Sequence, residues 1–85
     1  MMKKILYFSA EWCGPCKAIK PQMQQISNEV PIQFIDIDSS RQTADYYMIK
    51  SVPCVLLIDE MGSVRGRLVG NSITKQSVIN LYKNQ

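Results

Sequence analysis

Histidine is absent from this 85-residue sequence, and cysteine occurs only three times. A Cys-x-x-Cys pair can form half of a structural zinc site, but one further cysteine cannot complete a set of four nitrogen or sulfur ligands. An odd number of cysteines also fits a disulfide-stapled secreted domain poorly. The cysteines therefore favour redox or catalytic chemistry in a reducing compartment, and we predict no bound metal or other cofactor.

Concentrated charge and long apolar runs are also missing. Ten Lys and Arg against seven Asp and Glu give a net charge of +3, and no basic block is longer than Lys3-Lys4. Nucleic-acid-binding proteins gather basic residues on one face, so we predict no such partner. The apolar run at residues 5–8 is shorter than the roughly 7–15 residues of a signal-peptide core, and none approaches the roughly 18 that span a membrane. We expect a soluble, cytoplasmic protein.

Length and composition indicate one ordinary globular domain. The chain is 46% hydrophobic and 20% charged, which is typical of soluble proteins rather than disordered or fibrous ones. Its length suffices for one compact domain but not for two. We therefore predict a single domain over residues 1–85 and expect it to be a monomer.

Strand-like and helix-like patterns alternate along the chain. Strands are predicted at residues 3–9, 31–37, 52–58 and 63–69, and helices at residues 13–29, from Ser39 or Ser40 to 49, and from Ser72 or Thr74 onward. The first strand is apolar on both faces, as in a central strand, and Pro21 should kink the first helix. The βαβ unit at the start of the chain implies a right-handed crossover and parallel strands. The last two strands are joined by a tight turn, which implies an antiparallel hairpin. The order βαβαββα predicts an α/β fold: a four-stranded mixed sheet with helices on both faces.

The chemistry is expected at Cys13 and Cys16, which follow the first strand and occupy the first turn of a helix. Residues three apart share a helix face, so the two sulfurs can form a reversible disulfide. The free N–H groups and the positive dipole end of the helix stabilise a thiolate, which is the reactive form of cysteine. We expect Cys13, nearer the exposed end, to be the nucleophile. Pro15 fits the first turn, and Gly14 leaves the approach to Cys13 open.

Core packing is the plain alternative for this pair, but Trp, Gly and Pro are poor residues for the core of a helix. Residues 10–17, Ala-Glu-Trp-Cys-Gly-Pro-Cys-Lys, resemble the active-site motif of the thioredoxin family. Other matches to the family pattern are Pro21, Ile37-Asp38, Val52-Pro53, Gly62 and Val69-Gly70. The resemblance covers nearly the whole chain. The family's amino-terminal strand and helix have no counterpart, so the layout resembles the shorter, glutaredoxin-sized thioredoxin-like fold.

The resemblance implies a protein-disulfide reductase that acts on disulfide-containing substrate proteins. Cys13 would attack the substrate disulfide and Cys16 would resolve the mixed disulfide, after which a thioredoxin reductase or glutathione would restore the dithiol. The Gly-Pro pair between the cysteines suggests a reductant, since thioredoxin is a reducing couple at about −270 mV. The backbone of Val52, in the family's cis-proline dipeptide, would pair with the substrate. The implied substrate-binding patch is Trp12, Gly14, Pro15, Val52, Pro53 and Gly70.

Several positions depart from the family pattern. Tyr7 stands where the family has a buried aspartate that moves protons for the second cysteine, and Phe34 replaces the lysine companion of that aspartate. The usual proton relay is therefore absent. Ser9 replaces an aromatic residue, and Cys54 replaces the threonine after the cis-proline. Tyr7, Lys17 and Cys54 are candidate modulators of the site, although we expect Cys54 to be a core residue because free cysteines pack as small hydrophobes.

Other interpretations stay open. Some thioredoxin-fold proteins are rigid binding modules whose cysteines are dispensable. The short length also suits a glutaredoxin-type enzyme that uses glutathione or carries an iron–sulfur cluster. Pro53 has a plain alternative too, because proline is commonly the first residue of a strand.

Overall fold

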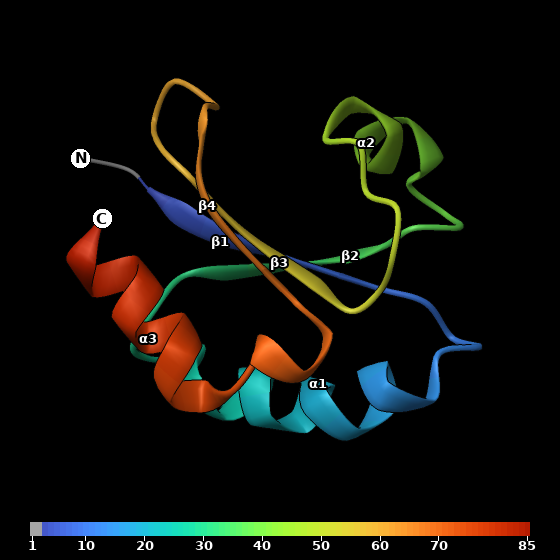
Figure 1. Ribbon diagram of the computed structural model, residues 1–85, viewed down its shortest axis with the longest axis horizontal. Helices are drawn as coiled ribbons and strands as arrows, with labels where there is room; N and C mark the ends of the chain where they lie inside the picture. The colour runs from blue at the N-terminus through green and yellow to red at the C-terminus, as the bar shows by residue number, and fades with distance from the viewer. Residues whose placement is uncertain (1–2) are drawn as a thin grey trace.

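The computed structural model describes residues 3–85. It confirms the predicted order of four strands and three helices, with one added turn of 3-10 helix, η1, between the last strand and the last helix (Figure 1). The elements are β1 (Lys4–Ser9), α1 (Gly14–Ile26), β2 (Ile32–Asp36), α2 (Arg41–Tyr46), β3 (Cys54–Ile58), β4 (Val64–Val69), η1 (Gly70–Ser72) and α3 (Lys75–Asn84).

The sheet is mixed, as predicted, with the strand order β2-β1-β3-β4. β1 pairs in parallel with β2 and antiparallel with β3, and β3 and β4 form an antiparallel hairpin. β1 is a central strand, and its four middle residues are buried on both faces of the sheet. In the parallel pair Tyr7 lies opposite Phe34, and both strands end at the edge where α1 begins.

Helices cover both faces of the sheet, and each face has its own apolar core. α1 and α3 lie against one face, and α2 lies on the other (Figure 1). The first face buries Ile5, Tyr7, Met23, Ile26, Val30, Val55, Leu57, Ile73 and Val78. The second face buries Leu6, Phe8, Ile35, Cys54, Leu56 and Ile58. Since alternate residues of a strand point to opposite faces, β1 and β3 contribute to both cores.

Two helices end earlier than the sequence predicted. α1 ends at Ile26 rather than near residue 29, and the buried Val30 then returns the chain to the sheet with its N–H 3.1 Å from the carbonyl oxygen of Ile26. α2 ends at Tyr46 rather than residue 49 because Met48 is left-handed, with φ 55°. Its N–H and that of Ile49 donate to the last carbonyls of α2, which is a Schellman motif without glycine.

The helix starts match the expected positions more closely. Ser40 is the N-cap residue of α2, although its side chain makes no capping hydrogen bond. Thr74, rather than Ser72, caps α3 through a reciprocal pair of hydrogen bonds with Ser77. Pro21 lies inside α1, and the kink expected there stays a prediction.

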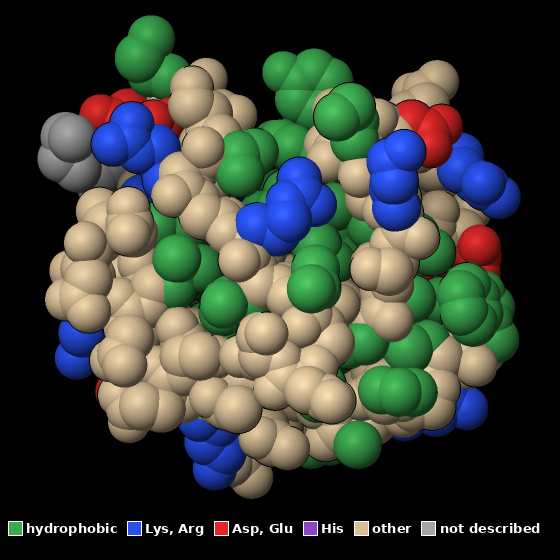
Figure 2. All heavy atoms as spheres, viewed as in Figure 1, with side chains coloured by type: hydrophobic (Ala, Val, Ile, Leu, Met, Phe, Trp, Pro, Cys, Tyr) green, Lys and Arg blue, Asp and Glu red, His purple; other side chains and the backbone are tan. Residues whose placement is uncertain are grey.

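Positively charged side chains are scattered over the visible surface, as they are along the sequence (Figure 2). Figure 2 shows Lys and Arg side chains spread over the visible face rather than gathered into one patch. Among residues 3–85, no helix combines the length and the apolarity needed to cross a membrane.

Candidate active site

Cys13 and Cys16 form a disulfide at the start of α1, with their Cα atoms 5.3 Å apart. Cys13 is the N-cap residue, and its Sγ lies 3.2 Å from the backbone nitrogen of Cys16, whose N–H points at it. Such N–H groups at a helix start stabilise negative charge. In the disulfide form both sulfurs are covered: Cys13 is 5% exposed and Cys16 is 2% exposed. Cys13 was expected to be the more exposed of the two cysteines, and in the disulfide form it is only slightly more exposed than Cys16.

The loop before β3 lies against Cys13. The Val52 carbonyl oxygen is 3.7 Å from Cys13 Sγ, and the Val52–Pro53 peptide bond is cis, as the resemblance implied. Gly70 donates its N–H to the carbonyl oxygen of Pro53 at 3.1 Å. It has a positive φ of 54°, which suits glycine. The structure thus brings Val52, Pro53 and Gly70 together beside the disulfide, with Pro53 itself buried.

Trp12 supplies the most exposed apolar surface of the motif. Its side chain is 68% exposed, and Gly14 and Pro15 beside it are exposed as well. Its indole Nε1 donates a hydrogen bond of 2.9 Å to Asp38 Oδ2 in the loop after β2. This role of Asp38 was missed from the sequence. Its position just after a parallel strand is a signal, because functional side chains gather at the carboxyl ends of such strands.

Tyr7 lies beneath the first turn of α1 and has no exposed surface. Its hydroxyl donates a hydrogen bond of 3.1 Å to the carbonyl oxygen of Cys16. Its ring meets that of Phe34 edge-on, with the ring centres 5.7 Å apart. Burial raises the pKa of Tyr7 to about 12. Tyr7 is therefore protonated at neutral pH and cannot accept a proton from Cys16, in agreement with the sequence.

The raised pKa of Tyr7 makes the stability of the fold sensitive to alkaline pH. An unfolded tyrosine ionises near pH 10, whereas folded Tyr7 has a pKa of about 12. Between these values the unfolded state loses its proton more readily, so the free energy of unfolding should fall with rising pH, by about 2 to 3 kcal/mol from this group. In Tyr7→Phe this contribution to the fall in the free energy of unfolding should be absent. Urea unfolding of the disulfide forms across alkaline pH tests this, and equal slopes for both proteins would contradict it.

Cys54 lies in the core, as the sequence predicted. It is 1% exposed and packs with Phe8 and Leu56 on the sheet face that α2 covers. Arg67 lies over it, with Nη1 3.7 Å from Cys54 Sγ and Nη2 donating to the Tyr47 carbonyl oxygen at 3.3 Å. Burial raises the pKa of the Cys54 thiol, and the charge of Arg67 opposes that rise. The thiol is therefore neutral and shielded, which is unfavourable for redox chemistry.

Alkylation of the native, reduced protein should modify Cys54 at least about a hundredfold more slowly than Cys13, because a buried neutral thiol reacts only when the structure opens. Cys54→Thr should keep disulfide-exchange turnover close to that of the unaltered protein. Timed iodoacetamide labelling with peptide mass analysis measures the first effect. Rapid labelling of Cys54, or loss of turnover in Cys54→Thr, would show that the thiol takes part in the chemistry.

A cavity of about 710 Å³ opens on the β2 side of the disulfide. Cys16 is part of its wall, whereas Cys13 is not. Lys17 is exposed at this cavity, so the structure places this candidate modulator near Cys16. In the part of the chain that the structure describes, no three Asp, Glu, His or Cys side chains are grouped as for a metal ion. The lining residues are Ser9, Ala10, Glu11, Cys16, Lys17, Lys20, Phe34, Ile35, Asp36, Asp38 and Ser39.

Comparison with known proteins agrees with this geometry. The family model described as Thioredoxin matches residues 2–83. The thioredoxin of Chlamydia trachomatis is 39% identical over 80 residues, covering 91% of this chain and 76% of that protein. Thioredoxin C-2 of Corynebacterium nephridii is 40% identical over 67 residues, covering 74% of this chain and 61% of that protein.

Solved structures show the same similarity. Thioredoxin 1 from Thermosipho africanus superposes with a TM-score of 0.81 and 28% identity, covering 95% of this chain and 91% of that one. The reduced thioredoxin pre-protein of Schistosoma mansoni gives 0.85 and 30% identity, covering 96% of this chain and 77% of that one. With its disulfide at the start of the first helix, the chain belongs to the thioredoxin family of thiol–disulfide oxidoreductases.

Proposed function

We propose that this chain reduces disulfide bonds in substrate proteins, with Cys13 as the nucleophile and Cys16 as the resolving cysteine. The observation that carries the assignment is the position of Cys13 as N-cap residue, where the N–H of Cys16 points at its Sγ from 3.2 Å. After reduction that N–H can donate to a Cys13 thiolate. Cys16 lies one turn further into the helix, where fewer N–H groups are free to act in this way.

The reaction has two exchange steps. The Cys13 thiolate attacks one sulfur of the substrate disulfide, and the other substrate sulfur leaves with the bonding electrons and takes a proton from solvent. Cys16 then loses its proton and attacks Cys13 Sγ, which forms the Cys13–Cys16 disulfide and releases the second substrate sulfur as a thiol. The substrate gains two electrons and two protons, and the cysteine pair loses them.

The substrate is an extended segment of protein that crosses the surface around Cys13. Trp12, Gly14 and Pro15 are exposed on one side of the sulfur. Gly14 leaves this side open, because a methyl group added there would meet no atom within 4 Å. On the other side the half-buried Val52 and Gly70 flank the buried Pro53. The backbone of Val52 pairs with the substrate and brings its disulfide next to Cys13.

The dithiol is restored by a thioredoxin reductase or by glutathione. A dithiol that must return to its reduced form suits the cytoplasm, where the thiol pool is kept reduced. The chain acts as a monomer in this scheme, since one copy contains both cysteines and the surface around them.

Reduction of insulin disulfides tests this function. The assay is run with the unaltered chain and, in parallel, with thioredoxin reductase plus NADPH or with glutathione plus its reductase as electron donor. The control is Cys13→Ser combined with Cys16→Ser, which replaces both sulfurs by oxygen and changes no other side chain. We expect catalysed reduction with at least one donor and none from the double variant.

The outcomes separate the candidate functions. Turnover with either donor supports the proposed protein-disulfide reductase, and turnover with glutathione but not with thioredoxin reductase assigns it to the glutaredoxin-type use of glutathione. No reduction with either donor, together with partner binding unchanged in the double variant, would replace the proposal with a rigid binding module.

A further inference from the structure

The resolving step requires Cys16 to lose a proton, and the core side of the site offers no base for it. Tyr7 lies closest in that direction, but its hydroxyl is a hydrogen-bond donor to the Cys16 carbonyl oxygen. Phe34, its neighbour across the parallel strands, is apolar, and the two rings pack edge-on. The two strand positions where the family has an acid and a lysine therefore hold an aromatic pair.

Cys16 is only 2% exposed in the disulfide form, but it is part of the wall of the cavity of about 710 Å³. The wall of this cavity also includes Phe34 and residues of the loop after β2, and the cavity is open to the surface. A space of this size that is lined by charged side chains holds water. Water in this cavity can take up the proton that Cys16 must release.

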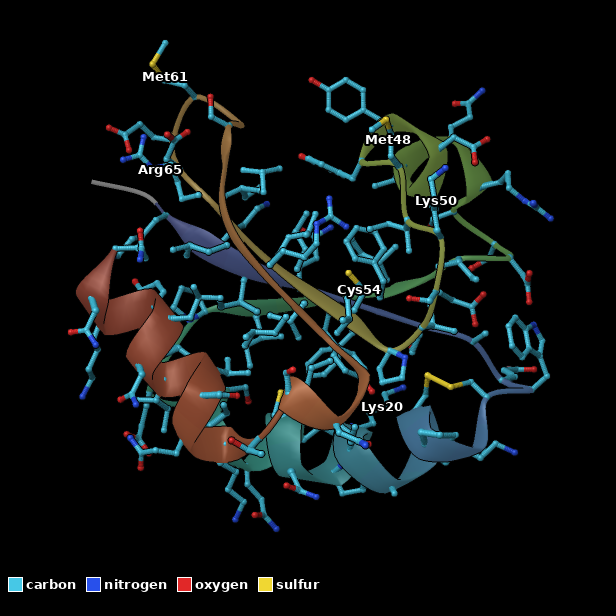
Figure 3. All side chains as sticks on the ribbon, in the orientation of Figure 1. Lys20, Met48, Lys50, Cys54, Met61 and Arg65 are labelled. Atoms are coloured by element: carbon cyan, nitrogen blue, oxygen red, sulfur yellow. A yellow bond between two sulfur atoms is a disulfide. The ribbon has the colours of Figure 1, made fainter. Side chains whose placement is uncertain are left out.

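Lys20 brings a cation to the same cavity from α1. It lies four residues after Cys16, so the two side chains share one face of the helix. Its Nζ lies over the Phe34 ring, 5.9 Å from the ring centre. Figure 3 labels Lys20 on α1, and the yellow bond of the disulfide lies at the start of the same helix. The Phe34 ring thus forms the surface on which the ammonium of Lys20 lies.

The other charged groups at the cavity have partners or lie at the surface. Asp38 accepts the indole hydrogen bond of Trp12, and the Asp36 carboxylate accepts from the backbone N–H groups of residues 38 and 39. Glu11, Lys17 and Lys20 are all exposed, and of the two lysines only Lys20 lies four residues after Cys16, on the same face of α1. The titratable and charged groups that line this cavity or contact Cys16 are Tyr7, Glu11, Cys13, Lys17, Lys20, Asp36 and Asp38.

We propose that Lys20 is a positioning residue for the resolving step, whose ammonium stabilises the Cys16 thiolate through the water of this cavity. This inference rests on the proposed function. The Cys16 thiol gives its proton to cavity water, the Cys16–Cys13 bond forms, and the bond from Cys13 to the substrate sulfur breaks. The substrate sulfur leaves with the electron pair and is protonated by solvent. No oxidant other than the mixed disulfide is needed.

Stopped-flow reaction of the fully reduced protein with 4,4′-dithiodipyridine separates the two steps. This aromatic disulfide is neutral, so its binding is insensitive to a change of protein charge. Attack by Cys13 releases one thiopyridone, and resolution by Cys16 releases a second. The two absorbance phases are measured over a pH series, at low salt and at high salt.

Lys20→Gln should slow the second phase about threefold to fivefold at neutral pH and low salt and change the first by less than about twofold. The pH at which the rate of the second phase is half-maximal should rise in Lys20→Gln. High salt should reduce the difference in rate between this variant and the unaltered protein. Lys20→Arg keeps the cation and should restore the rate. Tyr7→Phe should change the second phase by less than about tenfold, because Tyr7 supplies no base.

The matched control is Lys83→Gln, which removes the same charge from the last turn of α3, far from the disulfide (Figure 1). It should change neither phase. An unchanged second phase in Lys20→Gln, an equal slowing of both phases, or the same effect in Lys83→Gln would overturn the role of Lys20. These results leave insulin reduction by the unaltered protein intact, whereas absence of that reduction would overturn the proposed function itself.

Discussion

Replacing Cys16 with serine should turn the protein into a trap for its substrates, whereas Cys13→Ser should trap nothing. In Cys16→Ser the N-cap thiolate still attacks, but no second sulfur is present to release the mixed disulfide. In Cys13→Ser the attacking sulfur is gone, and the remaining Cys16 is 2% exposed in the disulfide form. Each variant should lower insulin-reduction turnover by about a thousandfold or more, as is usual when a covalent nucleophile or its partner is lost.

The trapped species are measured by non-reducing electrophoresis after incubation with insulin whose disulfides are intact. Peptide mass mapping of the mixed disulfide then identifies the cysteines that it joins. The matched control is Cys54→Thr, which removes the third thiol and should show normal turnover with no trapping. If Cys13→Ser accumulates mixed disulfides and Cys16→Ser does not, the roles of the two cysteines are reversed.

Tyr7→Asp should destabilise the fold by about 3 to 5 kcal/mol at neutral pH, because it leaves a cavity and places a carboxylate in an apolar core. Tyr7 has no exposed surface, and its ring packs on Phe34. The buried carboxyl favours its neutral form, so the loss should be larger at neutral pH than at acid pH. Urea unfolding of the disulfide form at the two pH values measures this difference.

Tyr7→Phe is the control for this change. It keeps the ring and loses the hydrogen bond to the Cys16 carbonyl oxygen, at a cost of about 1 kcal/mol. A Tyr7→Asp protein as stable as Tyr7→Phe at neutral pH would show that the position accepts a charge. Substituting the family's aspartate alone would then be enough to place an ionised base beneath Cys16.

The features that the sequence predicted correctly depend on local signals. Apolar residues without alternation marked β1 as a central strand, and the cysteine spacing after it marked the start of α1. The resemblance placed the cis bond at Val52–Pro53 and put Gly70 in the same patch, where the structure has it. In each case a few neighbouring residues contain the physical cause, so a short stretch of sequence is sufficient.

The features that were missed depend on contacts between distant segments or on uncommon local geometry. Met48 ends α2 in the left-handed conformation, which at the end of a helix is usually adopted by glycine, so the sequence contains no glycine to indicate it. The hydrogen bond from Trp12 to Asp38 joins residues 26 positions apart. The approach of Lys20 to Phe34 depends on how α1 packs against β2. No pattern within one segment specifies such pairings.

The central claim is that Cys13 and Cys16 form a reversible, reducing dithiol–disulfide couple. Equilibration of the protein in glutathione buffers of known potential, followed by acid quenching, alkylation and peptide mass analysis, tests it directly. We expect one two-electron transition at this pair, with Cys54 unchanged and the pair largely oxidised at about −230 mV, because the potential of thioredoxin, about −270 mV, lies below that value. A pair still largely reduced at that potential, as a more oxidising couple would be, or cysteines that do not titrate together, would contradict the claim.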